Sequence, residues 1–228
     1  YDPRRVRVAD AGVLWLSRTP LVVGSRSWGD WARRSALWAK LVYVETGGCV
    51  LVVNTHFDHV SMLSRRRSAQ LVHRVAPHAL LMGDFNAWPR RFVHTVLLDG
   101  RYDPLEGARH THNAFTRRDR GRIDWILVPE ELRVRRAEVL DARRPDGGPA
   151  SDHLPVLVDV EPPAAPREEL PRRMWTCRTP VETKLPPAPF EGASLPLLAR
   201  RTRSPEPEGR LPTHKKGGRP SRTRSSTR

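Results

Sequence analysis

The stretch LLMGDFNAWP, residues 80–89, is an apolar run that breaks into polar residues and then ends at a proline. In a β-strand alternate side chains share a face, so Asp84 and Asn86 are predicted to point one way and Phe85 the opposite way. Two interpretations are open at this point. The polar residues are either the turn chemistry that is common after a strand, or one edge of a functional site.

Strand-length runs of the same kind, rich in Val, Leu, Ile and aromatic residues, recur on both sides of this stretch. Between two of them, residues 60–76 repeat apolar side chains at helical spacing, as in Leu63, Leu71 and Val75, which predicts an amphipathic helix. A strand–helix–strand order indicates a layered α/β fold. The predicted strands are residues 40–46, 49–57, 79–85, 122–128, 132–140 and 153–160.

The C-terminal part differs in composition from the rest of the chain. Residues 162–228 hold 13 of the 22 prolines and 15 Lys or Arg against 6 Asp or Glu, with no sustained apolar period. We therefore expect a globular domain over residues 1–161 and a disordered, Pro- and Arg-rich tail over 162–228. The formal net charge of +15 favours polyanionic partners. Two cysteines are too few for a disulfide framework, and no apolar run is long enough to span a membrane.

Four polar clusters lie at the ends of predicted strands or inside them. Taken singly, each one fits solvent-exposed loop residues better than a catalytic site. Asp124 is harder to dismiss, because a carboxylate between Ile123 and Trp125 is costly to bury without a partner. Taken together, the carboxylates and amides suit Mg²⁺, and the histidines can move a proton or hold a phosphate oxygen. The clusters are NTHFDH (54–59), GDFN (83–86), RIDWILV (122–128) and SDHLPV (151–156).

In their order along the chain, these motifs resemble the endonuclease/exonuclease/phosphatase superfamily, the relatives of pancreatic deoxyribonuclease. The resemblance covers roughly residues 1–160 and includes VLWLSRTP (13–20) and GSRSWGDWARRSALWAKL (24–41). It implies a two-sheet α/β sandwich of the deoxyribonuclease-like type. It also implies a hydrolase of phosphate esters, with nucleic acid among the family's substrates and Mg²⁺ or Mn²⁺ as the cofactor.

The resemblance assigns catalytic roles to five residues. His153 matches the residue that either takes the proton from the attacking water or braces the phosphate, and Asp124 matches the partner that orients it. Asp84 matches the aspartate that orients the water or assists the leaving group. Asn86 matches an amide that hydrogen-bonds the phosphoryl oxygens, and His56 matches a histidine that contacts the phosphate.

Further site residues follow from the same resemblance. Asp152 matches a metal-site carboxylate, and Arg34 falls where relatives carry an arginine that faces the site. Asn54 is a weaker candidate for binding substrate. Asp58 and His59 are as suited to shaping a loop as to touching substrate, and strand alternation predicts Asp58 on the same face as Asn54.

The chain departs from the family pattern at its beginning. The resemblance implies a metal-binding glutamate after an early strand and an asparagine well before VLWLSRTP, and neither has a counterpart here, because this sequence starts too late in the family pattern. Glu45 is no substitute for the glutamate, because it lies on a different strand. We therefore expect an N-terminally incomplete domain, with poor folding and little activity if residues 1–228 are the whole product, and an ordinary active enzyme if they are part of a longer chain. The alternative function is a non-catalytic, basic remnant that binds polyanions in a salt-sensitive way.

The sequence carries little information on the substrate. The segment 100–121 is the predicted substrate-facing loop, but its basic charge fits any phosphate ester. This sequence shows no targeting signal, so the localisation is left open, and no feature of the sequence indicates an oligomer. The basic residues of the loop are Arg109, His110, His112, Arg117 and Arg118.

Overall fold

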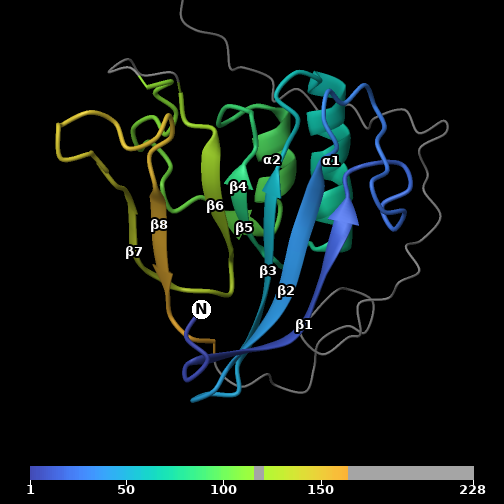
Figure 1. The fold of residues 1–228 in the computed structure, drawn as a ribbon. Helices are drawn as coiled ribbons and strands as arrows, with labels where there is room; N and C mark the ends of the chain where they lie inside the picture. The colour runs from blue at the N-terminus through green and yellow to red at the C-terminus, as the bar shows by residue number, and fades with distance from the viewer. Residues whose placement is uncertain (116–120, 164–228) are drawn as a thin grey trace, which may run out of the picture. The chain divides into compact units, whose positions relative to one another are not determined.

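The computed structural model describes residues 1–115 and 121–163 (Figure 1). The predicted disordered tail from residue 164 onward lies outside the described residues, as do Arg117 and Arg118 of the basic loop. The predicted domain boundary at residue 161 therefore stays a prediction.

In the described part, six strands form one mixed sheet in the order β1-β2-β3-β4-β6-β5, and two strands form a second sheet, β7-β8. The predicted two-sheet α/β fold is confirmed. The elements are β1 (Val6–Trp15), β2 (Ser35–Tyr43), β3 (Cys49–His56), α1 (Met62–Val75), β4 (Leu80–Asp84), α2 (Phe92–Leu98), β5 (Arg101–Tyr102), β6 (Asp124–Pro129), β7 (Val134–Val139) and β8 (Val156–Val160).

The central strands are joined by one helical crossover. β1, β2 and β3 pair antiparallel, whereas β3 and β4 pair parallel and are connected through α1. A parallel pair needs such a crossover. α1 lies within the predicted helical segment 60–76 and begins after Ser61, whose Oγ accepts the N–H of Ser64 at 3.1 Å. The strand predicted at 40–46 is the second half of β2, which ends at Tyr43 because a turn follows.

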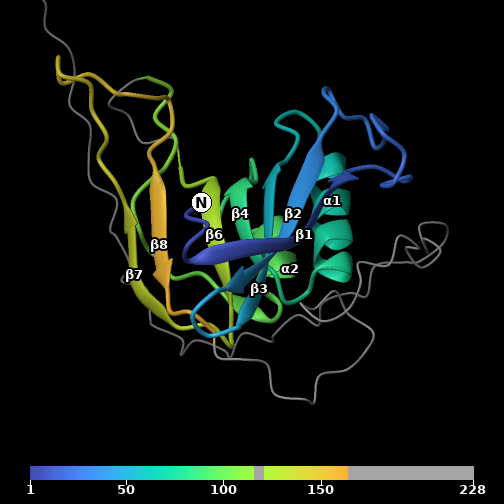
Figure 2. The same ribbon diagram turned by 60° about the horizontal axis from the view of Figure 1, so that its bottom comes forward.

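The two faces of the six-stranded sheet are covered by different elements. Helices α1 and α2 lie along one face, and the β7–β8 pair lies on the other (Figures 1 and 2). On the helix side, the ring of Trp125 stacks on Phe85 at 4.8 Å and meets the ring of His94 in α2 edge-on at 4.7 Å. On the β7–β8 side, apolar residues of three neighbouring strands pack with those of β8. They are Val50, Val52, Leu80, Met82, Ile126 and Val128, against Val158 and Val160.

Candidate active site

The face that packs on β7–β8 turns from apolar to polar at one end of β3, β4 and β6. His56 pairs with Asp84 in the parallel register of β3 and β4, and Asp84 pairs with Asp124 in the antiparallel register of β4 and β6. Side chains at paired positions on one face are neighbours. Accordingly, Nε2 of His56 lies 3.5 Å from Oδ2 of Asp84. The alternation of side chains along these strands, which places the apolar residues on this face, thus also brings three of the predicted catalytic residues together.

His153 joins this cluster from the segment that precedes β8. Its Nδ1 lies 2.8 Å from Oδ2 of Asp124, so the carboxylate that is costly to bury has a hydrogen-bonded partner. The position of His153 is held by backbone bonds, since the N–H of Leu154 donates to the carbonyl of Thr111 at 2.6 Å. The Asp124–His153 contact that the resemblance implied is present in the structure. The catalytic roles of the two residues remain predictions.

The cluster shifts the pKa of two of its members upward. Burial raises the pKa of Asp84, and the nearby charge of Asp124 raises it further, although the N–H of Asn86 opposes the shift. Burial acts to lower the pKa of His153, but the hydrogen bond and the charge of Asp124, with the charges of Asp84 and Asp152, outweigh it and raise that pKa. Asp84 is therefore a stronger base than an ordinary carboxylate, and His153 favours its imidazolium form.

His56 has the opposite tendency. Burial lowers its pKa, and the charges of Arg34 and His153 lower it further against the opposing charge of Asp84. The neutral imidazole is therefore favoured. Arg34 lies at the end of the loop that precedes β2. Its Nη2 donates a hydrogen bond to Nδ1 of His59 at 3.0 Å, and its side chain is 14% exposed. Arg34 thus lies beside the predicted phosphate-contacting residues, while Asn54 is exposed on β3 two positions before His56.

Asn86 reaches the site by a turn, and the prediction that it continues the strand alternation is wrong. β4 ends at Asp84, and Asn86 has a φ of 48°. Its backbone N–H donates to Oδ1 of Asp84 at 2.8 Å, and its Nδ2 donates to the carbonyl of Phe57 at 2.9 Å. The turn and the site edge are therefore the same feature. Phe85, predicted to point away, is fully buried against Phe57.

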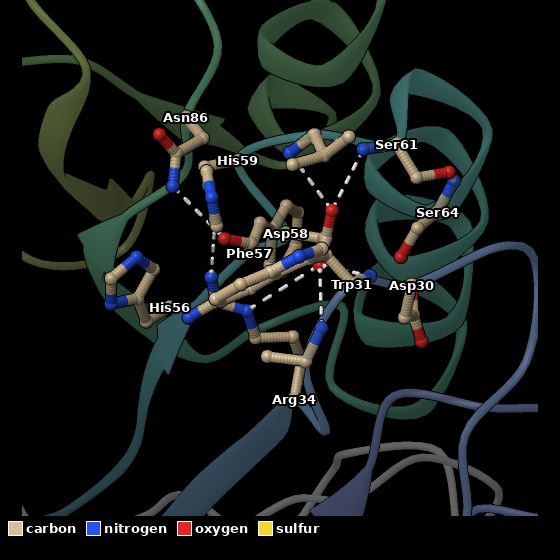
Figure 3. A network of polar contacts seen from close by, with 12 residues as sticks. Asp30, Trp31, Arg34, His56, Phe57, Asp58, His59, Ser61, Ser64 and Asn86 are labelled. Carbon is tan, nitrogen blue, oxygen red and sulfur yellow. Dashed lines mark hydrogen bonds and ion pairs between the residues drawn. The ribbon is translucent and has the colours of Figure 1, made fainter.

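Asp58 is not on the face of Asn54, contrary to the alternation of β3. The strand ends at His56, and the Asp58 side chain is fully buried, where it organises two loops (Figure 3). Oδ1 accepts the N–H groups of Val60 and Ser61 at 2.9 and 2.7 Å. Oδ2 accepts the N–H groups of residues 31 and 32 at 3.0 and 3.4 Å and lies 3.8 Å from Nε of Arg34. Burial acts to raise the pKa of Asp58, but the four N–H bonds outweigh it and lower that pKa.

Asp58→Asn is expected to destabilise the protein by about 3 kcal/mol, because the amide NH₂ would face two backbone N–H groups in a buried site. Urea unfolding measures this loss. Asp159→Asn, an exposed carboxylate on β8, is the matched control and should change stability by less than about 0.5 kcal/mol. Equal stabilities of the two variants would show that Asp58 does not organise these loops.

With this geometry in place, comparisons with known proteins identify the family. A family model described as the endonuclease/exonuclease/phosphatase family matches residues 2–153. The chain belongs to this family. Family membership supports a phosphoesterase activity of the nuclease or phosphatase type.

Solved structures agree with this family assignment. The chain is similar to the endonuclease/exonuclease/phosphatase from Bacteroides vulgatus, with 30% identity, 72% of this chain and 69% of that chain covered, and a TM-score of 0.64. It is similar to a mannosyl-6-phosphatase from Bacteroides thetaiotaomicron, with 28% identity, coverage of 71% and 69%, and a TM-score of 0.62. The human Nocturnin catalytic domain shares the fold, at 19% identity, coverage of 70% and 61%, and a TM-score of 0.53.

Two groups of described residues in this family member could hold a divalent cation. Asp84, Asp124 and His153 form the first, and His112, Asp152 and His153 form the second; within each group the ligand atoms lie within 4.8 Å of one another. The first group offers two carboxylates, which suit Mg²⁺ or Mn²⁺, and a cation there would offset the burial and the charge of Asp124 that together raise the pKa of Asp84. Asp152, the predicted metal ligand, belongs to the second group.

Sequence reasoning missed a residue that supports this candidate site. Thr111 is fully buried, and its Oγ1 accepts the N–H groups of Ile123 and Asp124 at 3.1 Å each, which fixes the start of β6. No local pattern singles out this threonine, because its partners lie on a distant strand.

A buried ion pair behind the same strand was also missed. Oδ1 of Asp103 accepts a hydrogen bond from Nη1 of Arg122, and Oδ2 of Asp103 lies 3.1 Å from Nε2 of His94.

Within residues 1–115 and 121–163, no helix combines the length and the apolar character needed to cross a membrane.

Proposed function

We propose that this protein is a metal-dependent hydrolase of phosphate esters, in which water attacks phosphorus beside the Asp84–Asp124–His153 cluster. The observation that carries the proposal is the contiguity of His56, Asp84 and Asp124 on three paired strands, with His153 bonded to Asp124. Clustered acids of this kind are not needed to bind a polyanion, since they repel it. The similarity to a mannosyl-6-phosphatase supports a phosphate-ester substrate.

His153 and Asp84 receive different roles in this proposal. Asp124 engages Nδ1 of His153, which leaves Nε2 as the atom that faces substrate, and the raised pKa favours an N–H at that position. His153 therefore donates from Nε2 to a phosphoryl oxygen as negative charge builds there. Asp84 orients the attacking water and accepts its proton.

The remaining polar residues complete the phosphate site. His56, as a neutral imidazole, contacts a phosphoryl oxygen. Asn86 donates one Nδ2 hydrogen to Phe57, and its second Nδ2 hydrogen is assigned to the phosphate. Arg34 adds a positive charge beside His56. Mg²⁺ or Mn²⁺ at the Asp84 and Asp124 carboxylates would neutralise phosphoryl charge.

Removing divalent metal is expected to lower the hydrolysis of bis(p-nitrophenyl) phosphate, p-nitrophenyl phosphate or plasmid DNA by at least about 100-fold. The measurement is the rate in EDTA, followed by addition of excess MgCl₂ or MnCl₂, which should restore it. EDTA already saturated with Mg²⁺ is the control. A rate that EDTA leaves unchanged would contradict the metal dependence. Salt-sensitive DNA binding with no hydrolysis of any ester would favour the polyanion-binding alternative.

The pH dependence follows from the raised pKa of His153. Because the proposed active form combines the imidazolium of His153 with the ionised carboxylate of Asp84, kcat/KM should be highest between the pKa values of these two groups and should fall as the pH rises through the pKa of His153. Asp124→Asn removes the charge that raises this pKa, so the falling limb should move to lower pH, with a rate loss of about 10- to 100-fold from the weaker hydrogen bond and the weaker hold on the metal. The measurement is kcat/KM against pH for both proteins. A rate that rises with pH through this range would instead assign His153 the role of general base.

A further inference from the structure

His112, a residue of the predicted substrate-facing loop, lies directly opposite His153 in an isolated antiparallel bridge. The centroids of the two imidazole rings are 4.8 Å apart. Asp152 precedes His153, and one ligand atom from each of the three side chains lies within 4.8 Å of the others. The described residues therefore place two imidazoles and a carboxylate around one point.

Backbone hydrogen bonds hold the two segments that carry these ligands. The N–H groups of Asn113 and Ala114 both donate to the carbonyl of Asp152, at 2.8 and 3.2 Å. On the other side of the bridge, the N–H of Leu154 donates to the carbonyl of Thr111, a fully buried residue. Because these bonds do not involve the ligand side chains, the ligands are brought together before any ion binds, and little ordering of the backbone is needed.

The Asp124–His153 contact prepares His153 as a ligand. Metal-bound histidines commonly donate their other ring N–H to a carboxylate, which orients the imidazole and makes it a better donor. Here Nδ1 of His153 contacts Oδ2 of Asp124 at 2.8 Å, so Nε2 is the free nitrogen. Ligand atoms on a tetrahedral Zn²⁺ are about 3.3 Å apart, given zinc–ligand distances of about 2.0 Å, so modest side-chain rotation would close the site.

We propose that His112, Asp152 and His153 form a binding site for a transition-metal ion such as Zn²⁺, separate from the carboxylate pair of Asp84 and Asp124. Two imidazoles with one carboxylate suit Zn²⁺, Co²⁺ or Ni²⁺, whereas Mg²⁺ prefers an oxygen shell. His112 supplies the second imidazole that gives this site its preference for a transition metal, because Asp152 and His153 alone offer a single carboxylate and a single imidazole.

An ion at this site would act as an inhibitor. It would occupy Nε2 of His153, the atom that donates to the phosphoryl oxygen in the proposed hydrolysis, so ion and substrate exclude each other. This consequence rests on the proposed function. Binding of the ion does not, and it can be measured on protein with no detectable activity.

The binding test uses the full chain, free of any histidine tag and of metal. It is titrated with ZnCl₂ by calorimetry, and with Co²⁺ while visible absorption is recorded, both in millimolar MgCl₂. We expect one tightest site on the native protein. His112→Asn should lower the zinc affinity by at least about tenfold, since even substitutions of residues that only hydrogen-bond a metal ligand commonly lower the affinity that much. His110→Asn, on the same loop but outside the cluster, should leave it unchanged. Thermal unfolding of the metal-free proteins checks that each variant is folded, with His112→Gln as the second variant.

The activity test compares inhibition by ZnCl₂ at saturating Mg²⁺, with each variant referred to its own zinc-free rate. The zinc concentration for half inhibition should rise at least about tenfold in His112→Asn and stay unchanged in His110→Asn. Zinc affinity that is equal in native and His112→Asn protein, or displacement of the ion by millimolar Mg²⁺, would overturn the site. Zinc activation would overturn the inhibitory role. Absence of any hydrolysis alongside His112-dependent zinc binding would contradict the proposed function and leave the site standing.

Discussion

Replacing His153 by alanine is expected to lower kcat/KM for a phosphate ester by about 10³-fold. The loss has a direct physical reason: Nε2 of His153 is the proposed donor to the phosphoryl oxygen, and Asp124 holds the ring by its other nitrogen at 2.8 Å. Steady-state kinetics on bis(p-nitrophenyl) phosphate at saturating Mg²⁺ measure the effect, which corresponds to about 4 kcal/mol of transition-state stabilisation. Alanine also leaves Asp124 without its hydrogen-bond partner, so a lower stability of the folded protein adds to the loss of activity.

A second variant separates these two contributions. His153→Asn places an amide nitrogen where Nδ1 stands, so it can still donate to Asp124 while lacking any group in place of Nε2. Its activity should fall nearly as far as that of the alanine variant, with smaller loss of stability. His78→Ala is the control, because this exposed histidine lies beyond the opposite end of β4 from Asp84. A His153→Asn protein with native kinetics would exclude His153 from the reaction.

The strand residues of the site could be predicted from the sequence because they obey the period of the strand. His56, Asp84 and Asp124 continue the same alternation that buries Val52, Met82 and other core residues on the β7–β8 side of the sheet. The pairing of these strands with one another, however, follows from the order β3-β4-β6. Local sequence does not contain that order, and the family resemblance predicted only that these residues share one site.

The residues beyond the strand ends could not be predicted in the same way. Asn86 and Asp58 take positions that depend on backbone groups of distant segments, such as the carbonyl of Phe57 and the N–H of Trp31. Thr111 acts on the start of β6 from another loop. Once a strand ends, the period of two no longer applies, and the available hydrogen-bond partners decide where a side chain goes. Composition does not reveal those partners.

Replacing Gly83 by alanine is expected to lower the free energy of unfolding by about 4 kcal/mol, the sum of a strained backbone and an overfilled interior. Gly83 has a φ of 140°, and a Cβ at this position would lie 1.8 Å from the carbonyl oxygen of Thr55. That oxygen belongs to the backbone of β3, the parallel partner of β4, so a side-chain rotation cannot relieve the overlap. Urea unfolding followed by tryptophan fluorescence measures the loss.

The same substitution should reach the active site, because Gly83 and Thr55 immediately precede Asp84 and His56 in paired strands. Any separation of β3 from β4 lengthens the 3.5 Å contact between His56 Nε2 and Asp84 Oδ2. Gly47→Ala is the matched control: its φ of 66° is also positive, but nothing lies within 4 Å of an added Cβ, so it should cost only about 1 kcal/mol and leave kcat/KM unchanged. If the two alanine variants were equally stable and equally active, the close approach of β3 and β4 would not be what requires glycine at position 83. The expected difference of about 3 kcal/mol therefore combines the overlap with the Thr55 carbonyl and the greater backbone strain of an alanine at a φ of 140° than at 66°.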